Sequence, residues 1–454
     1  MHSTEEGPAR VDIDEARLRQ LFHDFIQAAL QRFIKLGLWP RPPAERYIEL
    51  GEHFSVPDME HMPELQRLHQ YFEASQFMRR FYYPRSTKLW APLLSMVLAE
   101  TDGDRVKSGT LGKYFRTYFR ELVAPYATWC QVDTISGLSC QTKFRLDRRS
   151  VLTPDASPSY HLRARVDFGG FHVSIHDKAA LVTTVKAEKR PLTYGPHELG
   201  FPQRGLALVE AVRLLKPGVP RLHCHASGQL SAFRFERPLA YEDPEGDLVL
   251  DEREAVVESK DTRRVRALWK ELLTRHERRR WGVRAERDGI DIALGRFSRA
   301  YEHGNWLDLV VDLTIAMEAL ISPGDQLELR HRIALRAAHL LGSGGNSSTA
   351  VYERVRKMYD ARSAIVHGRG PDEKEQARWL SALSGLEYDP NESMYPLVEA
   401  ALEAAREIVR RLIRGCMTLA EKGEPDPRWP LPDDFDQLML EISRRRVWQR
   451  EFQR

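Results

Sequence analysis

The chain has 454 residues, of which 42% are hydrophobic and 29% are charged, and its formal net charge is +3 at pH 7. This length accommodates two or three domains, and a charge so near zero means that any nucleic-acid surface must be local. No apolar run approaches the ~18 residues of a membrane span, and the polar, acidic N-terminus argues against a secretory signal. The four cysteines are scattered without a C-x2-C pair, which argues against a disulfide scaffold or a cysteine zinc site and fits a reducing cytoplasm.

Residues 1–138 are predicted to form a mainly helical N-terminal region, because apolar residues recur there at spacings of three and four. The expected helices are 10–37, 61–80, 87–100 and 110–129. In the last of them, KYFRTYFR (113–120) interleaves aromatic and cationic residues. This pattern is open to two interpretations, a stacking face for nucleic acid or an amphipathic helix with its rings in a core. The spacing favours the core.

Residues 139–262 are predicted to form a β-rich, α+β middle domain, because short apolar runs there are bounded by Pro, Gly and Asp. The expected strands are 144–146, 161–166, 171–175, 181–185, 221–238 and 247–258, with one helix at 206–215. Neither GxxxxGK[ST] nor GxGxxG occurs in this region. A phosphate-cradling loop is therefore not expected.

Two histidine pairs in the middle domain invite a metal interpretation. His172 and His176 are four residues apart, and His223 and His225 flank Cys224. On a strand, the members of either pair would share one face, which permits chelation. Even spacing also arises by chance, and no third or fourth ligand accompanies either pair. No metal and no cofactor is therefore predicted.

Residues 263–284 are predicted to form a charged helix that ends in a group of arginines, including Arg278, Arg279 and Arg280. Such a group is a candidate phosphate-contact surface, since each guanidinium can bind a phosphate through two hydrogen bonds. The alternative is a solvated, salt-bridged linker helix before the next domain. The three arginines are retained as candidate RNA-binding residues.

Residues 263–420 are predicted to form a helical bundle, because long amphipathic segments are joined by short loops. The expected helices are 290–301, 306–321, 327–341, 351–367 and 395–419, with a polar insertion before the last. The helix at 306–321 is almost wholly apolar, so its carboxylates Asp312 and Glu318 need partners. The whole chain is thus predicted to be an α+β multidomain protein with a C-terminal all-α bundle.

Residues 421–454 are predicted to be a Pro-rich linker followed by a basic tail that contains Trp448 and Phe452. The tail has two interpretations. It could bind RNA by charge and stacking, or it could dock as an amphipathic helix on the bundle or on a partner. Docking is the favoured interpretation.

The stretch MYDARSAIVHGRG (358–370) carries the strongest chemical pattern of the chain. A helix with apolar spacing is expected to run through Arg362 and to stop at His367 and Gly368, where glycine suits a left-handed C-cap. The pattern combines a titratable imidazole with a permanently charged guanidinium. Five residues of helix turn by about 140° net, so Arg362 and His367 of one chain do not share a face of a regular helix.

Three segments in order resemble the HEPN superfamily, in its Apea-like branch. They are DLTIAMEALIS (312–322), RHRIALRAAHLLG (330–342) and KMYDARSAIVHG (357–368), and the last contains the R-x4-H motif Arg362 to His367. The resemblance covers about residues 285–415. It implies a homodimer through the HEPN bundle, with two motifs beside a shared cleft.

The resemblance implies a metal-independent endoribonuclease (a hydrolase-type nuclease) without a cofactor. His367 would be the general acid or base, Arg362 would stabilise the charge on the phosphate, and Ser363 would bind phosphate or orient His367. Glu318 and Asp312 are expected to support the site. Arg330 and Arg369 join the arginines at 278–280 as expected RNA contacts.

The resemblance also suggests a cellular context. Relatives in prokaryotes often belong to toxin or antiphage (antiviral) defence systems with abortive infection, so the N-terminal half is expected to be a sensor or regulator in the cytoplasm. Its trigger would be a defence-system or phage-derived protein, and no membrane partner is expected. The alternative is a non-catalytic HEPN protein that dimerises or binds RNA as a scaffold, in which Arg362 merely forms an ion pair and His367 caps the helix.

Overall fold

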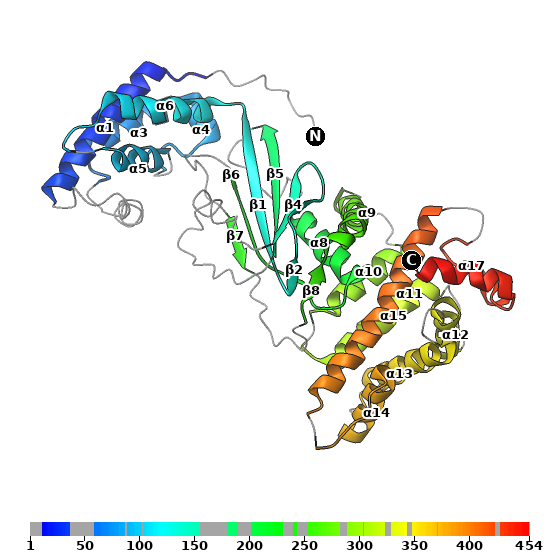
Figure 1. The fold of residues 1–454 in the computed structure, drawn as a ribbon. Coiled ribbons are helices and arrows are strands. Elements are labelled where there is room, and N and C mark those ends of the chain that lie inside the picture. The colour runs from blue at the N-terminus through cyan, green and yellow to red at the C-terminus, as the bar shows by residue number, and fades with distance from the viewer. Residues whose placement is uncertain are drawn as a thin grey trace.

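The structure is a computed structural model, and it is an α+β protein in which a helical region, a β-rich region and a second helical region follow one another (Figure 1). This order is the predicted one. The residues that it describes are 11–36, 59–86, 89–101, 103–154, 179–188, 201–229, 239–242, 253–281, 288–302, 304–322, 328–342, 347–369, 371–391, 393–422 and 427–453. Among these residues, none of the helices is long and apolar enough to cross a membrane.

The N-terminal helices enclose a core that is rich in aromatic rings. They are α1 (Glu15–Lys35), α3 (Pro63–Ala74), α4 (Gln76–Phe81), α5 (Ala91–Ala99) and α6 (Ser108–Val123). Phe115 and Tyr118 of α6 are fully buried, and Tyr114 and Phe119 pack against the same core. The core interpretation of KYFRTYFR is therefore confirmed, and its rings are not a stacking surface.

The middle region is built on one antiparallel sheet with the strand order β3-β4-β5-β1-β6-β7. A separate parallel pair joins β2 and β8. The strands are β1 (Tyr126–Ser136), β2 (Leu138–Cys140), β3 (Phe144–Arg145), β4 (Ser150–Pro154), β5 (Ala179–Glu188), β6 (Arg221–Gln229), β7 (Leu239–Glu242) and β8 (Ala255–Val257).

The long central strand β1 was not predicted. The helix expected at 110–129 ends at Val123, and β1 begins at Tyr126, so the sheet starts inside the range 1–138 that was assigned to the N-terminal region. The reason is local: Pro125 disfavours helical geometry at Ala124, whose ψ is 134°. The aromatic and β-branched residues that follow suit a strand.

The other strand predictions have mixed outcomes. The runs at 144–146, 181–185, 221–238 and 247–258 overlap β3, β5, β6 and β8, and the parts of the last two runs at 230–238 and 247–252 lie outside the described residues. The runs at 161–166 and 171–175 lie outside the described residues. The strand β7 was not predicted as a separate element.

Two helices, α8 (Phe201–Leu215) and α9 (Thr262–Trp281), lie between the sheet and the bundle (Figure 1). They correspond to the helices predicted at 206–215 and 263–284. The close approach of α8 to the sheet depends on Gly205, since a Cβ there would lie 2.8 Å from Asp133 Oδ2 on β1. The indole of Trp269 donates a hydrogen bond to the Arg204 carbonyl (3.1 Å) and so ties α9 to α8. The 3-10 turn Ser259–Asp261 leads into α9.

The C-terminal bundle is centred on α11, which packs against α10, α13 and α15. Its helices are α10 (Gly289–Arg299), α11 (Trp306–Ile321), α12 (Leu329–Leu341), α13 (Ser348–Val366), α14 (Glu373–Ser384), α15 (Tyr395–Lys422), α16 (Phe435–Leu438) and α17 (Ile442–Gln453). The predicted helix 306–321 has the bounds of α11. The five predicted bundle helices are all present, with ends shifted by a few residues.

The polar insertion expected before α15 contains a helix, α14, so this part of the prediction was wrong. The helix begins at the cap Asp372, whose Oδ1 accepts from the backbone N–H of Glu375 (2.7 Å), and it ends at Gly385 in a left-handed conformation. Its many charged residues mask the apolar stripe that buries Trp379 and Leu380. A short stripe with few members gives a weak periodic signal.

The basic C-terminal tail docks on the bundle as the helix α17, which confirms the favoured interpretation. Trp448 and Phe452 are almost fully buried, and α17 packs against α12 and α15. The rings of Trp448 and Phe452 are therefore unavailable to stack on RNA bases, and the alternative interpretation fails on that point.

Candidate active site

The motif residues occupy the last turn of α13 and the turn that follows it. Ser347 caps the start of the helix, because its hydroxyl accepts a hydrogen bond from Ala350 N–H (3.0 Å), and His367 occupies the C-cap position at the other end. Gly368 has φ +70°, the predicted left-handed conformation, and a Cβ at this position would meet nothing within 4 Å. The backbone N–H of Arg369 donates to the Ala364 carbonyl (2.8 Å) and closes the turn.

Arg362 points towards α11, where it contacts Glu318, the carboxylate expected from the sequence to support the site. Its Nη2 lies 3.5 Å from Glu318 Oε1, and the hydroxyl of Tyr359 donates to the same oxygen at 2.6 Å. The Arg362 side chain is 29% exposed, and its Nε is buried without a hydrogen-bond partner among the described residues. Within the described residues, Arg362 is thus held by one long ion pair, which leaves some of its N–H donors without an acceptor.

Tyr359 is the site residue that sequence reasoning placed only in the apolar stripe of the helix. Burial, followed by the hydrogen bond to Glu318, raises the pKa of its hydroxyl, so Tyr359 stays a hydrogen-bond donor. The guanidinium carbon of Arg362 lies 5.8 Å from the centre of its ring. The spacing of three residues between Tyr359 and Arg362 is a signal that they share a helix face.

His367 and Ser363 are exposed at the surface of the bundle. They are four residues apart, and the backbone N–H of His367 donates to the Ser363 carbonyl (3.1 Å), so both side chains lie over the same turn. The helix cap uses only backbone atoms of His367. No hydrogen bond or ion pair involves its imidazole within the described part of the chain.

Asp312 belongs to a different contact from the motif. Its Oδ1 accepts from Arg296 Nη1 of α10 at 2.8 Å, and the carboxylate is 5% exposed. Asp312 is six positions before Glu318, which places the two carboxylates on different faces of α11. Asp312 therefore fastens α10 to α11, and only Glu318 of the two expected supporting residues reaches Arg362.

The expected RNA contacts Arg330 and Arg369 are each engaged in an ion pair. Arg330 Nη2 lies 2.7 Å from Asp360 Oδ1. Lys357 Nζ lies 3.5 Å from the other oxygen of the same carboxylate, Oδ2. Arg369 Nη2 lies 2.6 Å from Glu375 Oε1 of α14. The side chains of Arg278, Arg279 and Arg280 lie outside the described residues.

The histidine pairs are not brought together with other metal ligands in the described part of the chain. His172 and His176 lie outside it, and of His223 and His225 only the backbone of β6 is described. Within the described residues, no group of three or more His, Cys, Asp or Glu side chains is placed to hold a metal ion.

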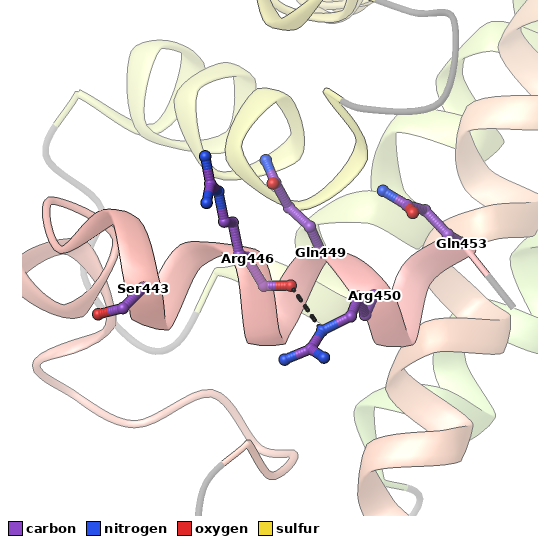
Figure 2. Close-up of a pocket in the computed structure, with 5 residues that line it drawn as sticks. All are labelled: Ser443, Arg446, Gln449, Arg450 and Gln453. Atoms are coloured by element: carbon purple, nitrogen blue, oxygen red, sulfur yellow. Dashed lines mark hydrogen bonds between the residues drawn. The ribbon is translucent and has the colours of Figure 1, made fainter.

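The outer surface of α17 is a second basic surface with a shallow hollow of about 570 Å³. Figure 2 shows Arg446 and Gln449 on one side of the helix and Arg450 on the other. Gln449 donates to the His339 carbonyl of α12 (2.8 Å), and Arg450 Nε donates to the Arg446 carbonyl (3.3 Å). The side chains of Arg446 and Arg450 extend in different directions, and the candidate site for chemistry is the end of α13.

We compared the chain with known proteins, and no family model, no curated protein and no solved structure matches it.

Proposed function

We propose that the protein is an endoribonuclease whose chemistry is carried out by His367, Arg362 and Ser363 without a metal ion. The observation that carries the proposal is the imidazole of His367, which is exposed and makes no side-chain hydrogen bond or ion pair among the described residues. The helix cap needs only the backbone of this residue. A histidine side chain that the fold does not use for a structural contact is available to a substrate as a proton donor or acceptor.

In the proposed reaction, an RNA 2′-hydroxyl attacks the adjacent phosphorus. A new bond forms between the 2′-oxygen and phosphorus, and the bond from phosphorus to the 5′-oxygen breaks. The 2′-proton passes to a general base, and the departing 5′-oxygen takes a proton from a general acid. The products are a 2′,3′-cyclic phosphate and a 5′-hydroxyl end, and His367 supplies one of the two proton transfers.

Arg362 would stabilise the negative charge that builds up on the phosphate. Its ion pair with Glu318 is 3.5 Å long, so the guanidinium retains donors that can bind phosphate oxygens. Glu318 and Tyr359 would set the direction of the guanidinium. Ser363, one turn before His367, would bind a phosphate oxygen or the imidazole.

A second copy of the chain would complete the site. Proton transfer at both ends of the reaction needs two groups, and each chain provides one His367. A homodimer about a two-fold axis would place two motifs beside one cleft. In the defence role that the HEPN resemblance suggests, a defence-system or phage-derived protein would act on the N-terminal half as the trigger, in the cytoplasm.

The test is the cleavage of total RNA and tRNA by the purified full-length protein in EDTA, with and without extract of infected cells. The matched control for His367→Ala is His331→Ala, which removes an exposed histidine of α12 that forms a hydrogen bond with Tyr352 (2.9 Å). Cleavage that leaves cyclic phosphates, persists in His331→Ala and disappears in His367→Ala is the expected result. Equal cleavage by both variants would overturn the proposal.

A scaffold function is the second candidate, and the ion pair between Arg362 and Glu318 favours it. A purely structural arginine needs such a partner, and Val366 on the same turn is an exposed apolar residue (59%) that suits a dimer contact. If the protein binds RNA or dimerises but never cleaves, with or without extract, this function replaces the first.

A further inference from the structure

A groove of about 910 Å³ runs along α14, directly after the motif in the chain. One wall is a stripe of α14 with Lys374, Arg378 and Ser381, which follow one another at spacings of four and three. The other wall is the segment after α14, with Tyr388 and Pro390. The volume falls within the range of small-molecule sites.

The two cations of the groove have no assigned structural role. Lys374 and Arg378 are exposed, and neither forms a hydrogen bond or an ion pair with any described residue. The bundle otherwise pairs many of its basic side chains, as Arg330 with Asp360 and Arg369 with Glu375 illustrate. Two cations one turn apart that have no partner within the described residues can bind a phosphate together.

The aromatic wall is held in place by a carboxylate at the start of α14. The hydroxyl of Tyr388 donates to Glu373 Oε1 (3.2 Å), and burial, together with this bond, raises the pKa of the phenol. Asp372, beside it, uses one oxygen to cap the helix. The groove therefore offers an oriented ring with carboxylate oxygens at one end and cations along the other side.

The groove begins shortly after His367 in the chain. Asp372, at the end of the groove, is five positions after His367 in the chain, so even an extended chain would place their Cα atoms within about 18 Å. The ion pair between Arg369 and Glu375 (2.6 Å) fastens the turn after the motif to the first turn of α14. A short stretch of single-stranded RNA can therefore reach both places.

We infer that this groove binds one nucleotide of the RNA substrate, beside the phosphate that is cleaved at His367. This inference rests on the proposed function. Tyr388 would stack on the base, as aromatic side chains do on single-stranded RNA. Lys374 and Arg378 would contact the phosphate, and the carboxylates of Asp372 and Glu373 would accept from base amines or ribose hydroxyls.

The mixed chemistry of the groove favours a nucleotide over other ligands. Two carboxylates and two cations line it, so a purely acidic or purely basic peptide would meet like charges. A nucleotide carries negative phosphate oxygens and positively polarised amine and hydroxyl donors on one molecule. It therefore complements both ends of the groove and its ring.

The test measures the Kd of a fluorescently labelled 12-nucleotide single-stranded RNA by anisotropy, with the full chain carrying His367→Ala so that the probe is not cut. Tyr388→Ala is expected to raise the Kd five-fold to a hundred-fold, and Tyr388→Phe, which keeps the ring, is expected to change it less than about threefold. Lys374→Gln with Arg378→Gln should raise the Kd at least tenfold and lower its salt dependence. Arg356→Gln, a cation of α13 paired with Glu353 (3.3 Å), is the control and should leave the Kd unchanged.

The possible outcomes distinguish a failure of the groove inference from a failure of the nuclease proposal. If RNA binds but none of the groove variants alters the Kd, the groove inference is wrong and the nuclease proposal stands. If the groove variants weaken binding but the chain with its native His367 never cleaves, the groove stands and the scaffold function is favoured. If the chain with its native His367 neither cuts RNA nor binds it, with or without extract, both proposals fail.

Discussion

Arg362 Nη2 lies 3.5 Å from Glu318 Oε1, across the contact between α13 and α11. The two residues are 44 positions apart in the chain, and their contact fixes the face of the bundle on which the motif stands. Tyr359 shares the same carboxylate oxygen. The orientation of the candidate catalytic arginine is thus coupled to the stability of the bundle.

Glu318→Ala is therefore expected to lower both stability and cleavage. It leaves the Tyr359 hydroxyl and the Arg362 guanidinium without their acceptor, at a cost of about 1–3 kcal/mol in unfolding free energy. Glu318→Gln keeps an acceptor and should cost less than half as much. Urea denaturation and initial cleavage rates of the two variants check this, and equal stability of both variants and the natural chain would contradict it.

Gly415→Ala is expected to displace the C-terminal helix. A Cβ at Gly415 of α15 would overlap the ring of Phe452 in α17, so the variant should lose about 1–3 kcal/mol. Limited trypsin digestion should then cut within the arginines of α17. The control is Gly295→Ala in α10, where a Cβ meets nothing within 4 Å; this change should stabilise the helix by about 1 kcal/mol.

The buried carboxyl of Asp133 makes stability depend on pH in a specific direction. Burial raises its pKa to about 8, whereas the unfolded value is about 3.9. The native state therefore keeps a proton that the unfolded state loses, so its contribution to stability is complete below about pH 4 and is lost as the pH rises towards 8. Asp133→Asn should remove this contribution. The check is the difference in unfolding free energy between the natural chain and Asp133→Asn from pH 5 to 9, and a difference that does not change with pH would contradict it.

Asp436→Ala is expected to loosen the segment that leads to α17. Asp436 binds Arg336 of α12 through two hydrogen bonds of 2.7 and 2.8 Å, and Arg336 is 3% exposed. Removal of the carboxylate leaves a buried cation with only part of its partners, which we expect to cost about 2–3 kcal/mol. Thermal unfolding of Asp436→Ala and of the exposed neighbour Asp433→Ala compares the effects, and equal melting temperatures would be the contrary result.

The ion pair between Asp436 and Arg336 also predicts that the free energy of unfolding decreases in acid. The hydrogen bond from Arg336 holds the pKa of Asp436 below its usual range. The pair therefore stabilises the native state above about pH 4 and loses that contribution as the pH falls through the lower native pKa. Asp436→Asn should reduce the acid-induced loss of stability, which denaturation between pH 2 and 5 measures.

The periodic segments of the chain were predictable from the sequence by itself. The apolar spacing of α1 and α11, the left-handed turn at Gly368 and the amphipathic tail all depend on contacts within a few residues or on a strong bias towards burial. Glu318 could also be named as a partner for Arg362, because a carboxylate on an apolar helix requires one.

Only the tertiary structure decided which contacts those segments make. The helix α14 has too few apolar residues to produce a strong periodic signal, and the strand β1, which begins after the local break at Pro125, takes its register from its pairing with β5 and β6. Three other features also required the tertiary structure, because they involve segments that are distant in the chain or share no sequence pattern. They are the hydrogen bond between Arg296 and Asp312, the burial of Trp448 and Phe452, and the groove beside the motif. Local spacing does not decide which face of a helix packs against its neighbours, and long-range packing does. In this protein, that packing leaves the imidazole of His367 in solvent and places the guanidinium of Arg362 against α11.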